Sequence, residues 1–142
     1  MAEKILAHHL QKAGVDGVRV TSAGTGDWHV GDSADHRTET ELRTHGYPTE
    51  HAAEQLGEQH LSADLVVALD TGHQRAILAQ GAPAERVRLL RSFDPEAGSD
   101  DVADPYYGGG DGFVTVREQI EAAVPGLLDW ARAAVTEAQD RP

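Results

Sequence analysis

The first fourteen residues, MAEKILAHHLQKAG, have the spacing of an amphipathic helix. Apolar side chains recur three or four residues apart along one face, namely Ala2, Ile5, Leu6, Leu10 and Ala13. Gly14 stands where a glycine commonly ends a helix. No Ser, Thr, Asp or Asn precedes the stripe, so the predicted helix begins without a capping side chain.

Three short apolar runs predict strands. Residues 18–21, VRVT, are rich in β-branched side chains and lead into a loop of small residues. Residues 65–69, LVVAL, are continuously apolar, which suits a strand covered on both faces and therefore a parallel sheet. Residues 87–90, VRLL, predict the third strand.

Three further helices are predicted between and after these strands. Residues 32–46 end at Gly46, and residues 71–81 form a short helix. From Phe113 onward, helical spacing continues to the C-terminal region, with a kink expected at Pro125. No linker, repeat or low-complexity tract divides the chain, so we expect a single domain over residues 1–142.

Strands that alternate with helices indicate an α/β fold with a parallel sheet. Such domains normally begin with a strand whose carboxyl end turns into the first helix, and ligands bind at that turn. In this sequence the first helix is present without that strand and turn.

Charge and cysteine content narrow the classes of function. The net charge of −12 argues against a nucleic-acid partner or an anionic membrane surface. No run approaches the length of a membrane span, so a cytoplasmic protein is expected. The chain has no cysteine, which excludes disulfides, thiolate metal sites and a cysteine nucleophile within these residues.

Neither a metal nor a cofactor is expected. The chain has eight histidines, but their spacing matches no metal-binding pattern: His8, His9, His29, His36, His45, His51, His60 and His73. The glycine-rich stretch 108–112 neither follows a strand in G-x-G-x-x-G form nor carries a Lys-Ser/Thr pair, which favours a plain loop over a phosphate cradle.

The stretch ADPYYGGG carries the most pointed chemistry. Taken alone, Asp104-Pro105 followed by glycine is an ordinary turn. However, Tyr106 and Tyr107 are two of only three tyrosines, and adjacent aromatic side chains on a loop are costly unless they line a site. An acid held by a proline beside an aromatic wall is a candidate proton donor to a leaving oxygen.

The chain resembles the low-molecular-weight protein tyrosine phosphatase family, and within it the actinobacterial branch. The resemblance covers essentially the whole chain, and its most specific part is the combination of SAGT…W with DPYYG. The stretches that carry it are MAEKIL, VRVTSAGTGDWHVG, HGYPTEHAAEQL, ADLVVALD, LLRSFDP and DVADPYYGG.

This resemblance implies a three-layer α/β/α fold and hydrolysis of phosphotyrosine in proteins through a phosphocysteine. Asp104 matches the general acid and base, and Ser22 matches the serine that braces the phosphate loop. Trp28, Tyr106 and Tyr107 match the aromatic rim around the phosphotyrosine ring. It further implies a monomer that needs no cofactor and binds neither nucleic acid nor membrane.

The sequence departs from the family where the nucleophile belongs. Nothing matches the Cys-x5-Arg phosphate loop or the first, central strand, so we expect an N-terminally truncated domain, with a misassigned start as one explanation. This chain is therefore expected to be inactive alone. A non-catalytic pseudophosphatase or binding module is the alternative, and export by a route not visible in the sequence is the alternative to a cytoplasmic location. An arsenate reductase is a weaker alternative, because it needs further cysteines.

Overall fold

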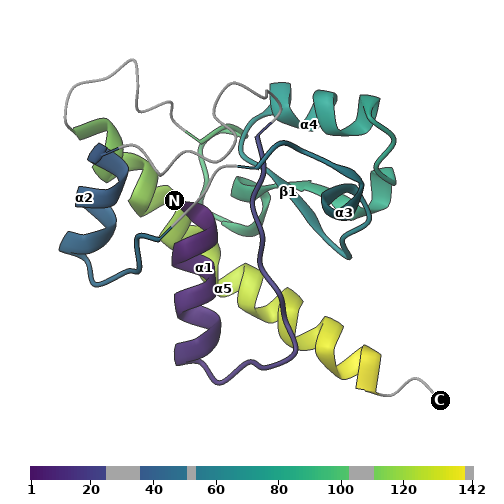
Figure 1. Ribbon diagram of the computed structural model, residues 1–142, viewed down its shortest axis with the longest axis horizontal. Coiled ribbons are helices and arrows are strands. Elements are labelled where there is room, and N and C mark those ends of the chain that lie inside the picture. The colour runs from purple at the N-terminus through teal and green to yellow at the C-terminus, as the bar shows by residue number, and fades with distance from the viewer. Residues whose placement is uncertain (25–35, 51–53, 103–110, 140–142) are drawn as a thin grey trace.

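The computed structural model describes residues 1–24, 36–50, 54–102 and 111–139 (Figure 1). The elements of the described chain follow in this order: α1 (Ala2–Lys12), α2 (His36–Thr44), α3 (Glu58–Leu61), β1 (Val66–Ala68), α4 (Thr71–Ala79), η1 (Ala84–Arg86), β2 (Val87–Leu89), η2 (Leu90–Phe93) and α5 (Asp111–Gln139). Two parallel strands connected through helix α4 confirm the predicted α/β class.

The sheet lies between two apolar layers. Strands β1 and β2 pair in parallel, with Val66 opposite Val87 and Ala68 opposite Leu89. Val66 and Ala68 face a cluster that includes Ile77 of α4, whereas Val67 packs against the larger core built on α5. Because successive strand residues point to opposite faces, this alternation gives the three-layer α/β/α arrangement expected from the sequence.

The prediction of a strand over residues 18–21 is wrong. Among the described residues, pairing in this region is limited to a single parallel bridge between Gly24 and Gln55. A β-branched run becomes a strand only when a neighbouring backbone pairs with it, and no described strand lies hydrogen-bonded to residues 18–21. Among the described residues, β1 has β2 as its one neighbouring strand.

The predicted ends of the first two helices are confirmed. Beyond α1, Gly14 takes a φ of 72°, and Val15 donates to the carbonyl of Leu10. Beyond α2, Gly46 takes a φ of 80°, and Tyr47 donates to the carbonyl of Leu42. Each glycine therefore adopts the left-handed conformation of a Schellman cap, which turns the following residue back onto the helix.

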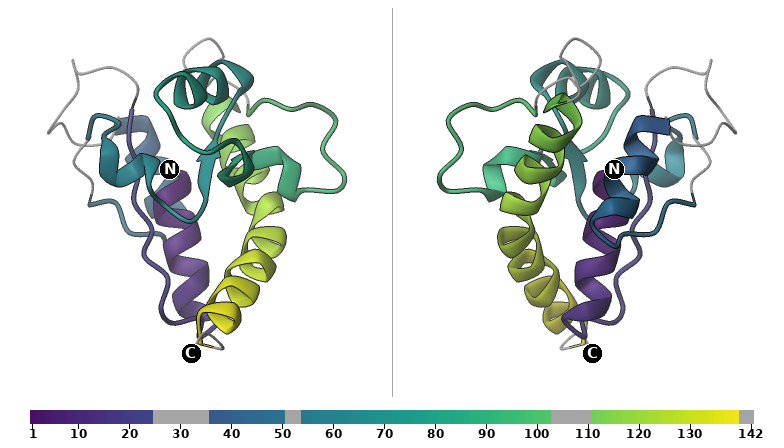
Figure 2. Two further views of the ribbon diagram at one scale, coloured as in Figure 1. Left: turned by 90° about the vertical axis from the view of Figure 1, so that its right-hand side faces the viewer. Right: turned by 90° about the vertical axis from the view of Figure 1, so that its left-hand side faces the viewer.

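The larger core is built around helix α5. Its inward stripe packs against α1, α2 and η2, and the buried residues of this core are Ile5, Leu42, Tyr47, Leu90, Phe93, Val102, Val116, Ile120, Ala123, Val124 and Leu127. The helix is continuous through Pro125, and Figure 2 shows it changing direction partway along its length, as a proline inside a helix predicts. No described helix is long and apolar enough to cross a membrane.

Candidate active site

Four of the five site residues predicted from the sequence lie outside the described residues. These are Trp28, Asp104, Tyr106 and Tyr107. Ser22 is described, and so are the points where the chain enters the two undescribed stretches, at Gly24 and at Val102. The geometry of the candidate site is therefore built from Ser22 and from these two points.

Ser22 lies against the first turn of α1. Its hydroxyl donates to Oε1 of Glu3 over 2.5 Å, and the ammonium of Lys4 lies 3.1 Å from Oε2 of the same carboxylate. The N-cap residue of α1, Met1, makes no capping hydrogen bond through its side chain. Ser22 thus stands beside the positive end of a helix dipole, where a phosphate loop followed by a helix would place its anion.

A buried histidine that the sequence did not single out supports the chain around Gly24. His60 accepts at Nδ1 from the amide of Gly57 over 2.9 Å, so its Nε2 carries the proton that reaches Glu54 over 3.0 Å. The turn held in this way pairs with Gly24, whose amide donates to the carbonyl of Glu54 over 2.8 Å. His60 is therefore a satisfied structural residue that fixes Gly24, two residues beyond Ser22.

The chain before Asp104 is fixed at the carboxyl end of β1. The amide of Val102 donates to the carbonyl of Leu69 over 2.8 Å, and the amide of Thr71 donates to Oδ1 of Asp101 over 2.9 Å. Asp70 caps α4 by accepting from the amide of His73 over 2.7 Å. This edge of a parallel sheet is where α/β proteins bind ligands, and it carries the backbone to within two residues of Asp104.

A polar network joins α1, α2 and α5, and sequence reasoning missed it. Tyr47 donates to Oε2 of Glu121 over 2.5 Å, and its hydroxyl lies 3.0 Å from Nε2 of His9. Arg117 donates through Nε to Glu41 over 2.6 Å and through a terminal nitrogen to Glu121. The Schellman turn at Gly46 explains how Tyr47, one position beyond it, reaches this core.

The network shifts the pKa values of its members in directions that its contacts explain. Burial, and then the hydrogen bond to Glu121, raise the pKa of Tyr47 to about 12. Burial lowers the pKa of His9 and neighbouring His8 lowers it further. The hydrogen bond to Glu41 raises the pKa of Arg117. The folded state therefore favours a neutral phenol and a neutral imidazole beside a charged guanidinium.

Stability should fall as the pH rises from 10 towards 12, because the unfolded chain then ionises a phenol that the folded chain keeps neutral. Tyr47→Phe should remove this part of the decrease in stability at alkaline pH. At neutral pH the same substitution should lower the free energy of unfolding by about 1–2 kcal/mol, because it removes the hydrogen bond to Glu121. Urea unfolding of both proteins at several pH values measures the difference. An equal alkaline slope in the two proteins would contradict the described contact.

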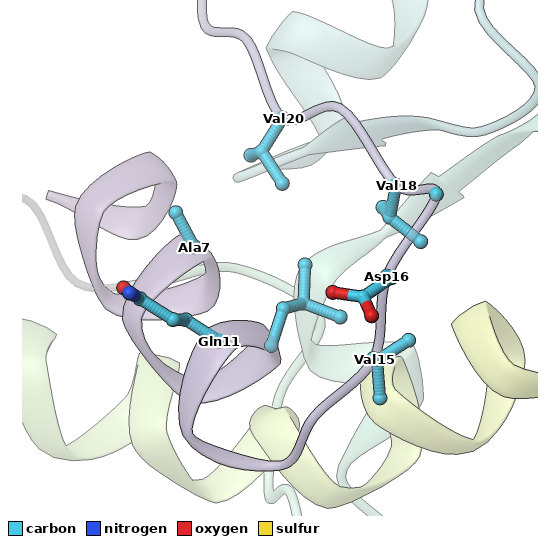
Figure 3. Close-up of a pocket in the computed structure, with 8 residues that line it drawn as sticks. Ala7, Gln11, Val15, Asp16, Val18 and Val20 are labelled. Carbon is cyan, nitrogen blue, oxygen red and sulfur yellow. The ribbon is translucent and has the colours of Figure 1, made fainter.

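No group of three metal-ligating side chains comes together in the described ranges. Several of the described histidines contact other groups, such as His45, whose Nε2 lies 3.3 Å from Oε1 of Glu41. A cleft of about 240 Å³ opens instead between α1 and the segment 15–20 (Figure 3). Its lining combines apolar side chains with two polar ones: Leu10, Val15, Val18 and Val20 beside Gln11 and Asp16.

Comparison with known proteins identifies the family. The sequence model of the family described as low molecular weight phosphotyrosine protein phosphatase matches residues 1–140. The chain is 56% identical over 133 residues to the low molecular weight protein-tyrosine phosphatase A of Mycobacterium tuberculosis, covering 92% of this chain and 82% of that protein. It is 52% identical over 143 residues to the low molecular weight protein-tyrosine-phosphatase of Streptomyces coelicolor, covering 95% and 87%.

The fold comparison agrees. A crystal structure of a protein tyrosine phosphatase from Entamoeba histolytica superposes with a TM-score of 0.86 at 24% identity, covering 94% of this chain and 88% of that one. At that identity the likeness concerns the fold alone, and the family assignment rests on the sequence matches. The chain belongs to the low molecular weight protein tyrosine phosphatase family.

Proposed function

We propose that this domain serves the hydrolysis of phosphotyrosine in proteins through a phosphocysteine intermediate. The observation that carries the proposal is the 56% identity to a named protein-tyrosine phosphatase along 92% of the chain. The paired tyrosines of DPYYG suit an aromatic ring. They therefore favour phosphotyrosine over phosphate monoesters whose leaving group is not aromatic. Trp28, Tyr106 and Tyr107 would hold that ring and its flanking peptide.

In this reaction a thiolate attacks phosphorus and the bond from phosphorus to the tyrosyl oxygen breaks. Asp104 would give its proton to that oxygen, since a phenolate leaves more readily as a neutral phenol. The resulting carboxylate would then take a proton from the water that attacks the phosphocysteine, which releases phosphate and regenerates the thiolate. Ser22, beside the first turn of α1, would brace the loop that binds the phosphate.

The 142 residues cannot supply the nucleophile, because they include no cysteine. We infer that the thiolate and the phosphate-binding arginine lie outside these residues, in a strand and loop that lead into α1. Such a strand would give β1 a second neighbour and residues 18–21 a first one, because among the described strands β1 pairs with β2 alone and residues 18–21 pair with none. The 142-residue chain alone would then be inactive, as a truncated domain.

Partners and location follow from the same proposal. The substrate would be a phosphotyrosine-containing protein bound by a monomer in the cytoplasm. A net charge of −12 disfavours nucleic acid and anionic membranes through long-range repulsion. A non-catalytic module that kept the aromatic rim is the second candidate, favoured by the absence of cysteine, and it predicts phosphotyrosine binding without turnover.

The test of Asp104 uses a chain extended at its N-terminus by a strand and a Cys-x5-Arg loop of the family pattern. Asp104→Ala should lower kcat for phenyl phosphate by about 10²–10⁴, because phenolate is a poor leaving group. The loss should be smaller for p-nitrophenyl phosphate, whose leaving group needs less protonation. Asp100→Ala, four residues earlier on the exposed surface, serves as the control. Equal small losses with both substrates would refute the acid role.

A further inference from the structure

One arginine of η2, the short helix that follows β2, contacts the segment just before Asp104. A terminal nitrogen of Arg91 donates to the hydroxyl of Ser99 over 2.7 Å and to the carbonyl of Asp101 over 3.3 Å. The hydroxyl of Ser99 in turn donates to the same carbonyl over 3.3 Å. We call Arg91, Ser99 and Asp101 the loop clamp. These bonds close the wide loop that follows η2 in Figure 2.

The loop clamp is also tied to the neighbouring strand. The carboxylate of Asp101 accepts from the amide of Thr71, the first residue of α4. A carboxylate is favourable there because it meets a free amide at the positive end of the helix dipole. The next residue, Val102, is buried and donates to the carbonyl of Leu69. The chain therefore leaves Val102 from a point fixed by β1, α4 and η2 together.

The contacts of Arg91 give it only a small contribution to the stability of the fold. No carboxylate lies within ion-pair distance of it among residues 54–102 or elsewhere in the described chain. Its Nε is buried without a hydrogen-bond partner. A buried donor without a partner destabilises the folded state, and hydrogen bonds at the exposed surface offset little of that destabilisation. What the guanidinium provides is a rigid group that reaches two acceptors of the same loop.

We propose that Arg91 and Asp101 are positioning residues that set the point from which Asp104 is presented to the substrate. The proposal rests on the proposed function, in which Asp104 is the general acid. Only two residues separate Asp101 from Asp104, and Pro105 restricts the backbone of the residue before it. A fixed departure point therefore limits the region that the carboxyl group of Asp104 can reach.

The first measurement is amide hydrogen exchange in the 142-residue chain. Arg91→Lys and Asp101→Ala should each speed exchange at Thr71 and Val102 by about fivefold, the loss of roughly one net hydrogen bond. Asp101→Asn keeps an oxygen that Thr71 can donate to, so it should restore most of the protection lost in Asp101→Ala. The matched controls are Arg86→Lys and Asp100→Ala, whose side chains are exposed and outside the loop clamp.

A second measurement separates positioning from general stability. In ¹H–¹⁵N spectra, Arg91→Lys should shift the resonances of Asp104 and Tyr106, although the substitution lies thirteen residues before Asp104 in sequence. Exchange at Ile120, in the middle of α5, should stay unchanged. Unshifted Asp104 and Tyr106 resonances would overturn the proposal, and so would an equal rise in exchange at Ile120. Because neither readout uses turnover, failure of the phosphatase activity is distinguishable from failure of the loop clamp.

Discussion

Replacing Arg117 by Met should lower the free energy of unfolding by about 3 kcal/mol. The side chains of Arg117 and Glu41 are 12% and 13% exposed, so water barely reaches the pair. Arg117 also bonds to Glu121, which accepts the hydroxyl hydrogen of Tyr47. Methionine would fill much of the volume but would leave the carboxylates of Glu41 and Glu121 without the cation that both contact. Loss of one partner of a buried ion pair costs far more than the pair contributes.

Arg43→Met is the matched control, because Arg43 on α2 is 64% exposed and lies 4.0 Å from Glu39. An exposed pair of this kind contributes little, so the control should change stability by less than about 0.5 kcal/mol. Urea unfolding measured at neutral pH compares the two variants. Equal small losses in both would mean that Arg117 does not connect α2 with α5 as described.

Gly126→Ala should destabilise the protein by about 2 kcal/mol, although alanine is the better helix former. A Cβ at position 126 would clash with the carbonyl oxygen of Phe93 and lie 3.1 Å from its Cβ. The gain in helix propensity is about 1 kcal/mol. The clash involves backbone, which cannot rotate away like a side chain, so α5 and η2 must separate. Overpacking therefore outweighs propensity.

Gly98→Ala controls for the change of residue type, because a Cβ at position 98 meets nothing within 4 Å. It should be neutral or slightly stabilising through the unfolded state. Thermal unfolding of both variants gives the comparison. A Gly126→Ala protein more stable than the parent would show that α5 does not pack closely on η2.

Sequence patterns correctly predicted those elements whose formation depends mainly on the residues within them. The run over 65–69 contains β1, and Gly14 and Gly46 mark the ends of α1 and α2. The run over residues 18–21 has an equally good strand composition but forms no ladder in the described chain. Composition supplies a preference for extended backbone, whereas a strand also needs a neighbour that composition cannot name.

The candidate site was reached through motifs rather than through periodicity. The role proposed for Asp104 rests on its place in DPYYG, and residue 104 lies outside the described residues. The contacts that pattern reasoning missed are those between distant parts of the chain. Tyr47 meets Glu121 across 74 residues and His9 across 38, and Thr71 meets Asp101 across 30. Nothing in HGYPTE or SDDVAD alone identifies such partners.

The most direct test of the central claim is the hydrolysis of p-nitrophenyl phosphate by the purified 142-residue chain. The same chain, extended at its N-terminus by a strand and a Cys-x5-Arg loop, is measured beside it. We expect no hydrolysis above buffer for the 142 residues, which contain no cysteine, and turnover for the extended chain. Turnover by the 142-residue chain that disappears in Asp104→Ala would contradict this expectation.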